Sequence, residues 1–166
     1  MKQRVLSILV DNTSGVLSRV AGLFSRRGYN IDSLTVGVTA DPKYSRMTVV
    51  CSGDDLVLEQ ITKQLDKLID VRDIKVLKRG ERVSRELILI KIKADAVARK
   101  GIIQIVDIFR AKIVDIAKES LIVELTGGQN KLEAFIELLD GYEILELART
   151  GMTALSRGMN DVRYLD

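Results

Sequence analysis

Hydrophobic positions along this chain follow two alternating periods, one typical of strands and one typical of helices. In the first half, the apolar run Arg4–Val10 predicts a buried strand, and the alternating residues of Leu34–Thr39 predict a second strand. Between them, apolar residues recur at helical spacing before Gly28, which is expected to end the helix. They define one helix face: Val16, Val20, Leu23 and Phe24.

The first half then continues with a turn, a strand, a helix and a strand. Asp41-Pro42-Lys43 is a turn sequence, and alternating residues follow it up to Cys51. An aspartate at position 54 or 55 is expected to cap a second helix, and Val71–Leu77 predicts a fourth strand. The apolar face of that second helix consists of Val57, Ile61, Leu65 and Leu68.

The second half repeats the order strand, helix, strand, strand, helix, strand. Asn130 and Glu133 resemble a capping box that opens its second helix. Each half therefore predicts an α+β unit of the ferredoxin-like βαββαβ type. We predict a first domain at residues 1–78, a linker at 79–84, a second ferredoxin-like domain at 85–150 and a C-terminal tail at 151–166 with little periodicity.

Composition removes most catalytic chemistries. The chain has 166 residues, no histidine and a single cysteine, Cys51. Without histidine there is no Ser-His-Asp triad, no Cys-His dyad and no His-ligated zinc. One cysteine excludes an internal disulfide, a CxxC redox pair and a thiolate metal cluster. Carboxylates and lysines remain available for acid-base chemistry, but no paired set stands out, so we assign no catalytic and no metal-ligating residue.

Charge and hydropathy give weaker indications. The net charge is +3, which is too small to indicate a nucleic-acid partner. The longest stretch without a charge, residues 33–40, is far shorter than the roughly 20 apolar residues of a membrane span. Disulfide-free cysteine usage fits a reducing cytoplasm. We therefore predict a cytoplasmic protein that binds neither a membrane nor a nucleic acid.

Ferredoxin-like folds host many functions, and several of them can be tested on the residues. An RNA-binding module of this topology stacks bases on strand aromatics, and neither Arg4–Val10 nor Arg46–Cys51 contains an aromatic residue. A copper chaperone requires two cysteines, and a phosphohistidine carrier requires a histidine. An acylphosphatase-like site requires an Asn and an Arg at a phosphate loop, and here no arginine after Asn12 precedes Arg19.

The most informative segment is Asp11-Asn12-Thr13-Ser14-Gly15-Val16, which joins the first strand to the first helix. Backbone N–H groups at a helix N-terminus bind carboxylates and phosphates, and glycine allows a ligand to approach the backbone closely. The alternative is a plain turn in which Thr13 or Ser14 caps the helix. The equivalent turn of the second half, residues 94–99, has no Asn and no Gly, which favours binding in the first half.

A second candidate is Asn30 in Gly28-Tyr29-Asn30-Ile31, just before the second strand. Its amide is both a donor and an acceptor, so it suits the ammonium and carboxylate of an amino acid. On spacing alone, a polar residue after a helix-ending glycine is the better explanation of Asn30.

The run from Asp11 to Leu34 closely resembles the regulatory, or small, subunits of acetolactate synthase, also called acetohydroxyacid synthase. Ser45-Arg46-Met47-Thr48 and Leu58-Glu59-Gln60-Ile61 continue the resemblance. Arg149-Thr150-Gly151 and the run Ala154–Gly158 extend it almost to the C-terminus. The resemblance implies that residues 1–78 form an ACT domain, a βαββαβ unit that binds amino acids at dimer interfaces.

The resemblance also implies a function. The chain would form a homodimer, bind and activate the thiamine-diphosphate-dependent catalytic subunit, and confer feedback inhibition by valine. Thiamine diphosphate, magnesium and FAD would belong to that catalytic partner, and this chain would hold no cofactor. The family's effector contacts map onto Asn12, Gly15 and Asn30, with their neighbours Val16 and Ile31. Thr13 replaces an acidic residue often found in the family.

Two other functions stay open on the sequence. One is a free-standing amino-acid sensor of the ACT type that controls another enzyme or a transcription factor. The other is a small ferredoxin-like enzyme that uses a carboxylate. A partner pull-down separates the first from a regulatory subunit, and turnover by the isolated chain would support the second.

Overall fold

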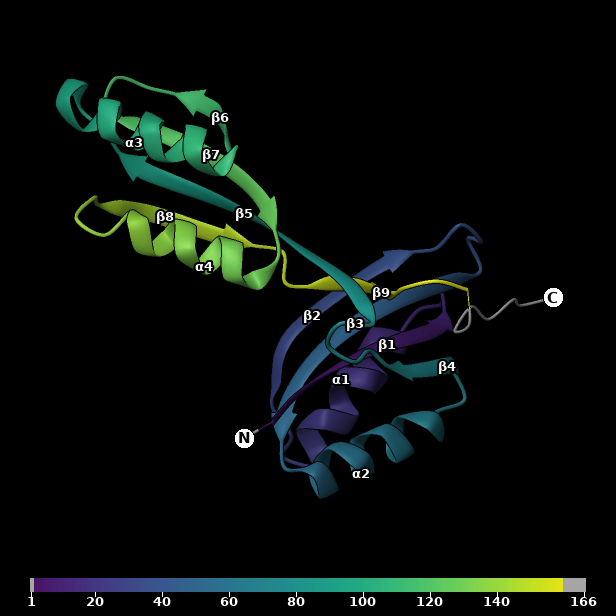
Figure 1. The fold of residues 1–166 in the computed structure, drawn as a ribbon. Helices are drawn as coiled ribbons and strands as arrows, with labels where there is room; N and C mark the ends of the chain where they lie inside the picture. Colours follow the sequence, from purple (N-terminus) through teal and green to yellow (C-terminus); the bar gives the residue numbers. More distant parts are fainter. Residues whose placement is uncertain (1, 160–166) are drawn as a thin grey trace. The chain divides into compact units, whose positions relative to one another are not determined.

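The computed structural model describes residues 2–159, which form two compact units (Figure 1). The first unit runs to Val83 and resumes at Met152, and the second is Ser84–Gly151. Each unit contains two helices and a sheet of antiparallel strands in the order βαββαβ. The predicted α+β fold with two ferredoxin-like units is therefore confirmed.

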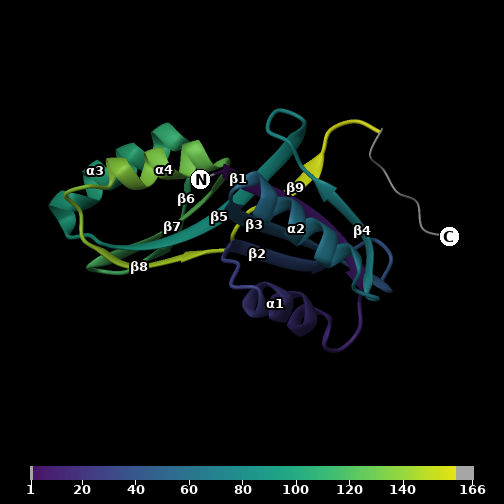
Figure 2. The same cartoon turned by 90° about the horizontal axis from the view of Figure 1, so that it is seen from below.

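The sheet of the first unit has the strand order β2-β3-β1-β4. Both helices lie on one face of this sheet (Figures 1 and 2). The apolar faces of the helices and the inward residues of the strands share one core, which is centred on Phe24, Met47 and Ile61. The elements are β1 (Lys2–Asp11), α1 (Val16–Arg26), β2 (Ile31–Val38), β3 (Tyr44–Gly53), α2 (Asp55–Asp66) and β4 (Val71–Val76).

The helix ends of the first unit follow from local chemistry. Asp54 caps α2, because its Oδ1 accepts from the Val57 N–H at 2.8 Å. Gly28, with φ of 68°, follows the end of α1 in the left-handed conformation that closes many helices. Glu59 and Lys63, four residues apart on α2, form an ion pair at 2.9 Å.

The second unit has the strand order β6-β7-β5-β8, again with its helices on one face of the sheet (Figure 2). Its core is built around Ile90, Val123 and Phe135. The edge-to-face pair Phe109–Phe135 joins its two helices. The elements are β5 (Arg82–Lys93), α3 (Ala96–Phe109), β6 (Lys112–Ile116), β7 (Ser120–Gly127), α4 (Gln129–Leu138) and β8 (Ile144–Arg149).

Three local expectations differ from the structure. The capping box at Asn130 is wrong: α4 begins at Gln129, its N-cap residue is Gly128, and no side chain caps it. Strand β5 begins at Arg82, inside the segment expected to be a linker. Residues 151–166 were expected to be an irregular tail, yet Thr153–Ser156 form the strand β9. The remainder of that tail, residues 160–166, lies outside the described residues, and the domain limits stay a prediction.

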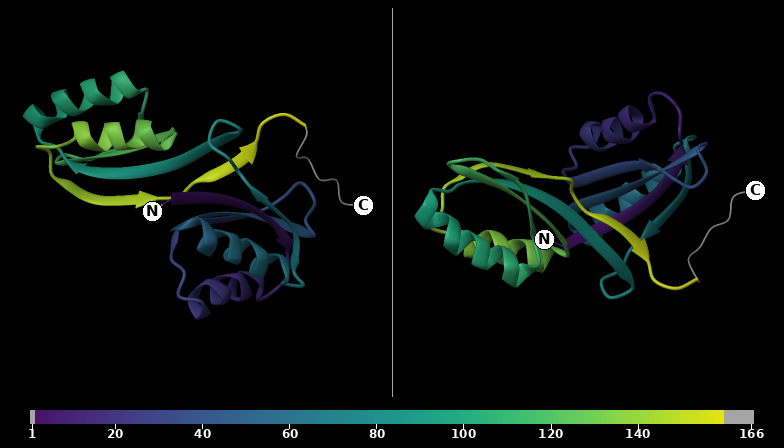
Figure 3. Two further views of the ribbon diagram at one scale, coloured as in Figure 1. Left: turned by 60° about the horizontal axis from the view of Figure 1, so that its bottom comes forward. Right: turned by 90° about the horizontal axis from the view of Figure 1, so that it is seen from above.

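Strand β9 packs on the sheet of the first unit, on the side away from α1 and α2 (Figures 1 and 3). Met152 and Ala154 join a small apolar cluster with Val5, Val50 and Leu77. The central strand β1 is thus covered on both faces, which explains why its residues from Val5 to Val10 are all buried. Among the described residues, no helix is long and apolar enough to cross a membrane.

Candidate effector site

The loop between β1 and α1 ends in a glycine with a left-handed backbone. Gly15 is the N-cap residue of α1, with φ of 84° and ψ of −6°. Residues other than glycine, asparagine and aspartate rarely adopt this conformation. No side chain caps the helix, so the expected caps Thr13 and Ser14 do not act as such. The first N–H groups of α1 therefore have no side-chain acceptor and can receive a carboxylate.

Asn12 fixes this loop to the turn between β2 and β3. Its backbone N–H donates to the Lys43 carbonyl at 2.8 Å. Its side-chain Nδ2 donates to the Pro42 carbonyl at 2.9 Å. The amide oxygen of Asn12 remains an acceptor that can bind an ammonium group. The loop is consequently held at one end of the sheet, next to the turn that follows β2.

A partly buried ion pair lies beside Gly15. Arg19 donates through Nε to Asp70 Oδ2 at 2.6 Å and through Nη2 to Asp70 Oδ1 at 3.1 Å. Asp70 is only 8% exposed. The hydrogen bond from Arg19 lowers the pKa of Asp70 and raises the pKa of Arg19. A Cβ atom built on Gly15 would lie 2.9 Å from Arg19 Nη1, so a cation faces the start of α1.

A second ion pair holds the other end of the loop. Arg72 donates to both carboxylate oxygens of Asp11, at 2.7 and 2.8 Å. This contact is the main reason why the pKa of Arg72 is raised. The Asp11 backbone N–H also donates to the Asp70 carbonyl at 2.9 Å, so the two pairs are connected through the backbone. Together they fix the residues on both sides of Asn12.

Sequence reasoning did not single out Arg19 and Asp70. Arg19 follows Gly15 by four residues, and its N–H makes the first helical hydrogen bond to the Gly15 carbonyl at 3.0 Å. The spacing of four residues could therefore have indicated that the Arg19 side chain lies near Gly15. Asp70 lies 51 residues further along the chain, and no local pattern indicates that it would meet Arg19.

Val16 occupies a different environment from the loop residues before it. Its side chain is 3% exposed and belongs to the core of the first unit. An effector at the loop can therefore reach the backbone of Val16 but not its side chain. We conclude that Val16 attaches the start of α1 to the core of the first unit.

Asn30 and Ile31 lie at the start of β2. Asn30 is exposed, and its Nδ2 donates to Asp32 Oδ1 at 2.9 Å. Asp32 also accepts a short hydrogen bond from the Ser52 hydroxyl. Ile31 is partly buried against the core. The amide oxygen of Asn30 is thus the polar group at this position that can accept from a ligand.

Within one chain these candidates form two separate groups. Asp11, at the end of β1, is opposite Tyr44 on β3, whereas Ile31, at the start of β2, is opposite Cys51. Seven residues of a strand span about 23 Å. The structure therefore brings Asn12, Gly15 and Val16 together at one end of the sheet, and Asn30 with Ile31 at the other end.

The second unit lacks an equivalent loop. Asp95 is the N-cap residue of α3, and its Oδ1 accepts from the Val97 and Ala98 N–H groups at 3.0 and 2.7 Å. The donors that an external carboxylate would use are already occupied. This finding agrees with the expectation that only the first unit has the open loop.

Other reactive groups do not form a site in the described part of the chain. Cys51 is fully buried, and burial raises the pKa of its thiol to about 11. Residues 2–159 contain no group of three or more acidic residues and cysteine that could hold a metal ion.

Family models match both halves of the chain. A model described as the AHAS small subunit-like ACT domain matches residues 6–73. A model described as the small subunit of acetolactate synthase matches residues 85–158. The chain is also 52% identical over 155 residues to a probable acetolactate synthase small subunit of Methanothermobacter thermautotrophicus, which covers 93% of this chain and 92% of the relative.

The chain belongs to the family of acetolactate synthase small subunits. It is 49% identical over 157 residues to the isozyme 3 small subunit of Escherichia coli, covering 94% of this chain and 96% of that relative. The crystal structure of the acetolactate synthase small subunit from Thermotoga maritima matches it with a TM-score of 0.88 and 43% identity. That match covers 96% of this chain and 99% of the solved chain. Membership in this small-subunit family supports a regulatory rather than a catalytic role.

Proposed function

We propose that this chain is the regulatory subunit of an acetolactate synthase. In this role it activates the thiamine-diphosphate-dependent catalytic subunit and makes it subject to feedback inhibition by valine. The observation on which the effector site rests is the uncapped start of α1 behind Gly15, with the Arg19 guanidinium beside it. Both the helix N-terminus and the guanidinium favour a carboxylate, which every amino acid carries.

A homodimer through the first unit explains how the two groups of candidate residues can share one ligand. β2 is an edge strand of the sheet, and two of its apolar residues, Val36 and Val38, are 45% and 61% exposed. If two copies pair antiparallel through β2, the start of one β2 lies beside the end of the other. The end of β2 leads into the turn to which Asn12 is bonded. Asn30 of a second copy would then approach Asn12 and Gly15 of the first.

This arrangement gives each candidate residue a role. The N–H groups behind Gly15 and the Arg19 guanidinium bind the carboxylate of valine. The amide oxygens of Asn12 and of Asn30 from the second copy accept from its ammonium group. Ile31 of the second copy offers apolar surface to the isopropyl side chain. In this proposal, thiamine diphosphate, magnesium and FAD belong to the catalytic subunit. We expect the complex to act in the cytoplasm.

An acetolactate assay of the catalytic subunit tests the proposal. The subunit is assayed alone and with this chain, each with and without valine. We expect higher activity with the chain and loss of that gain when millimolar valine is added. No change in activity on adding the chain would contradict the assignment as a regulatory subunit. Activation without any response to valine would contradict the effector but not the partner.

A further inference from the structure

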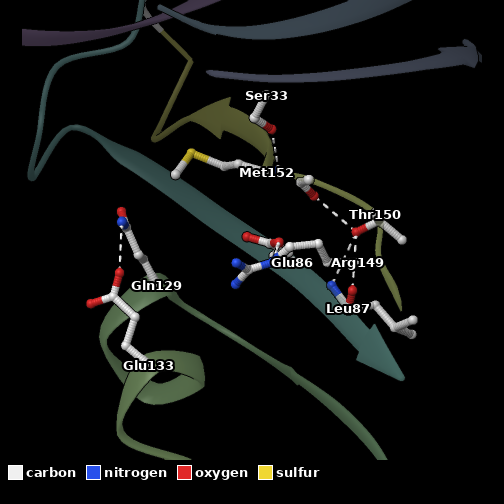
Figure 4. A network of polar contacts seen from close by, with 9 residues as sticks. Ser33, Glu86, Leu87, Gln129, Glu133, Arg149, Thr150 and Met152 are labelled. Atoms are coloured by element: carbon white, nitrogen blue, oxygen red, sulfur yellow. Dashed lines mark hydrogen bonds and ion pairs between the residues drawn. The ribbon is translucent and has the colours of Figure 1, made fainter. Parts of the chain in front are cut away.

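The backbone of Met152 is held on both sides by hydroxyl groups of β2. The Met152 N–H donates to Ser33 Oγ at 3.1 Å (Figure 4), and the Met152 carbonyl accepts from Thr35 Oγ1 at 3.0 Å. Two residues on, the Ala154 N–H donates to Thr48 Oγ1 of β3 at 3.4 Å. The backbone of this segment is therefore bonded to side chains that project from the face of the first sheet away from the helices, in addition to the pairing of β9 with β5.

The same segment covers apolar side chains on that face. Met152 and Ala154 are 8% and 4% exposed, and they cover Val5, Val50 and Leu77. The residue that follows them, Leu155, points away and is 60% exposed. At its end, the Arg157 N–H donates to the Glu81 carbonyl at 2.8 Å. The segment has one face that binds the sheet and one that does not.

The contact with Ser33 lies next to the proposed effector residues. The pairing of β2 with β3 shifts register between Ile31 and Ser33, so β2 is irregular where the effector residues join it. Hydrogen bonds of the strand ladder are interrupted at such a shift. The bond between Ser33 and Met152 supplies an attachment at this point, two residues after Ile31.

We propose that residues 152–156 are a detachable strap that positions the start of β2 and thereby sets the affinity for the effector; this inference rests on the proposed function. The strap is held by two buried side chains, by hydroxyl contacts and by the pairing of β9 with β5, and these contacts oppose the conformational entropy lost on ordering the segment. With the strap docked, Asn30 and Ile31 are held in the binding arrangement. With the strap released, β2 frays at its register shift. Binding of the effector must then also order this strand, which lowers the affinity for the effector.

The strap offers a matched pair of variants for a test. Met152→Asp places a charge in the buried contact, whereas Leu155→Asp places the same charge on the exposed side of the same segment. Both are assayed as the full chain with the catalytic subunit. For Met152→Asp we expect the valine concentration at half-inhibition to rise by about tenfold or more, with activation in the absence of valine retained. For Leu155→Asp we expect both values to stay within about twofold of the parent chain.

A second pair tests positioning without a buried charge. Ser33→Ala removes the acceptor for the Met152 N–H, and Ser33→Thr restores a hydroxyl at the same position. We expect weaker valine inhibition in the first variant and recovery in the second. Amide hydrogen exchange without valine should be faster for β2 in Met152→Asp and Ser33→Ala than in the parent chain. The exchange result reports on the strap even if valine is not the effector.

The outcomes separate the strap from the effector proposal. Equal valine response and equal β2 exchange in Met152→Asp and the parent chain would overturn the strap. Faster β2 exchange together with an unaltered valine response would overturn its positioning role. If the parent chain itself showed no valine response, the effector assignment would fail, while the exchange data would still decide whether the strap holds β2.

Discussion

Gly15 is the residue at which the proposed site is most sensitive to substitution. Gly15→Asp places a carboxylate where the carboxylate of valine is expected, beside Arg19 Nη1. Two like charges about 4 Å apart at an effective dielectric constant near 20 repel by roughly 4 kcal/mol. Half of that, about 2 kcal/mol, weakens binding more than tenfold. We expect valine inhibition to be lost while activation of the catalytic subunit remains, as measured in the acetolactate assay.

The control for this variant is Gly15→Asn. Aspartate and asparagine have the same size, and both tolerate the left-handed backbone with φ of 84°. The two variants differ in charge, so a much larger effect of aspartate isolates electrostatic repulsion. Alanine is a poor control, because a left-handed alanine costs about 1–2 kcal/mol by itself. Unchanged inhibition in the aspartate variant would overturn the placement of the effector at this loop.

Asp70 gives the stability of the first unit a defined pH dependence. The hydrogen bond from Arg19 lowers the pKa of Asp70 in the folded chain, relative to about 3.9 when unfolded. A lowered folded-state pKa stabilises the native state above the unfolded pKa, and this contribution is lost as pH falls through the folded pKa. We expect Asp70→Asn to lower the denaturant midpoint at pH 7 and to lower it less at pH 3. The exposed Asp140→Asn serves as control; an equal effect of Asp70→Asn at both pH values would contradict the pair.

Replacement of glycine by alanine should have opposite effects on stability in helices α1 and α3. A Cβ atom on Gly101 of α3 would collide with Tyr142 Oη, whereas the nearest atom to a Cβ on Gly22 of α1 is Arg26 Nη1 at 3.5 Å. Glycine inside a helix costs about 0.5–1 kcal/mol relative to alanine. We expect Gly22→Ala to raise the free energy of unfolding by about that amount, and Gly101→Ala to lower it by about 1–2 kcal/mol through overpacking.

Removing the Tyr142 hydroxyl completes this test. In Tyr142→Phe, the atom that collides with the new methyl group is absent, so Gly101→Ala should cost less in that background. Urea denaturation of the parent chain, the two single variants and the double variant measures the coupling. An additive double variant would show that the strain at α3 does not involve Tyr142.

The helices and strands of both units could be predicted because each has a strong period and a recognisable end. Asp54 and Gly28 mark helix limits by local chemistry, and the structure uses both. Contacts between distant residues could not be predicted in this way. Strand β9 has four residues, and Met152, the residue before it, makes bonds to Ser33 and Thr35 that span 119 and 117 positions of sequence. For the same reason, no sequence pattern indicated that Asp70 lies beside the effector loop.

At the scale of the whole molecule, the separation of the candidate residues within one chain leads to a test of the dimer. Each proposed site takes Asn12 from one copy and Asn30 from the other. Chains with Asn12→Ala and chains with Asn30→Ala should each form dimers in which both sites are damaged. A dimer of one chain of each kind should contain one intact site, because its unaltered Asn12 and unaltered Asn30 meet across the interface.

Refolding the two variants together therefore predicts a gain that neither shows alone. We expect isothermal calorimetry to detect valine binding with parent-like affinity at a reduced number of sites in the refolded mixture, and little binding in either variant by itself. Both variants mixed without unfolding serve as control, since their subunits exchange only by dissociation. If instead each site were formed within one chain, every site in the mixed dimer would lack one asparagine. Refolding would then restore nothing, and the dimeric effector site would have to be abandoned.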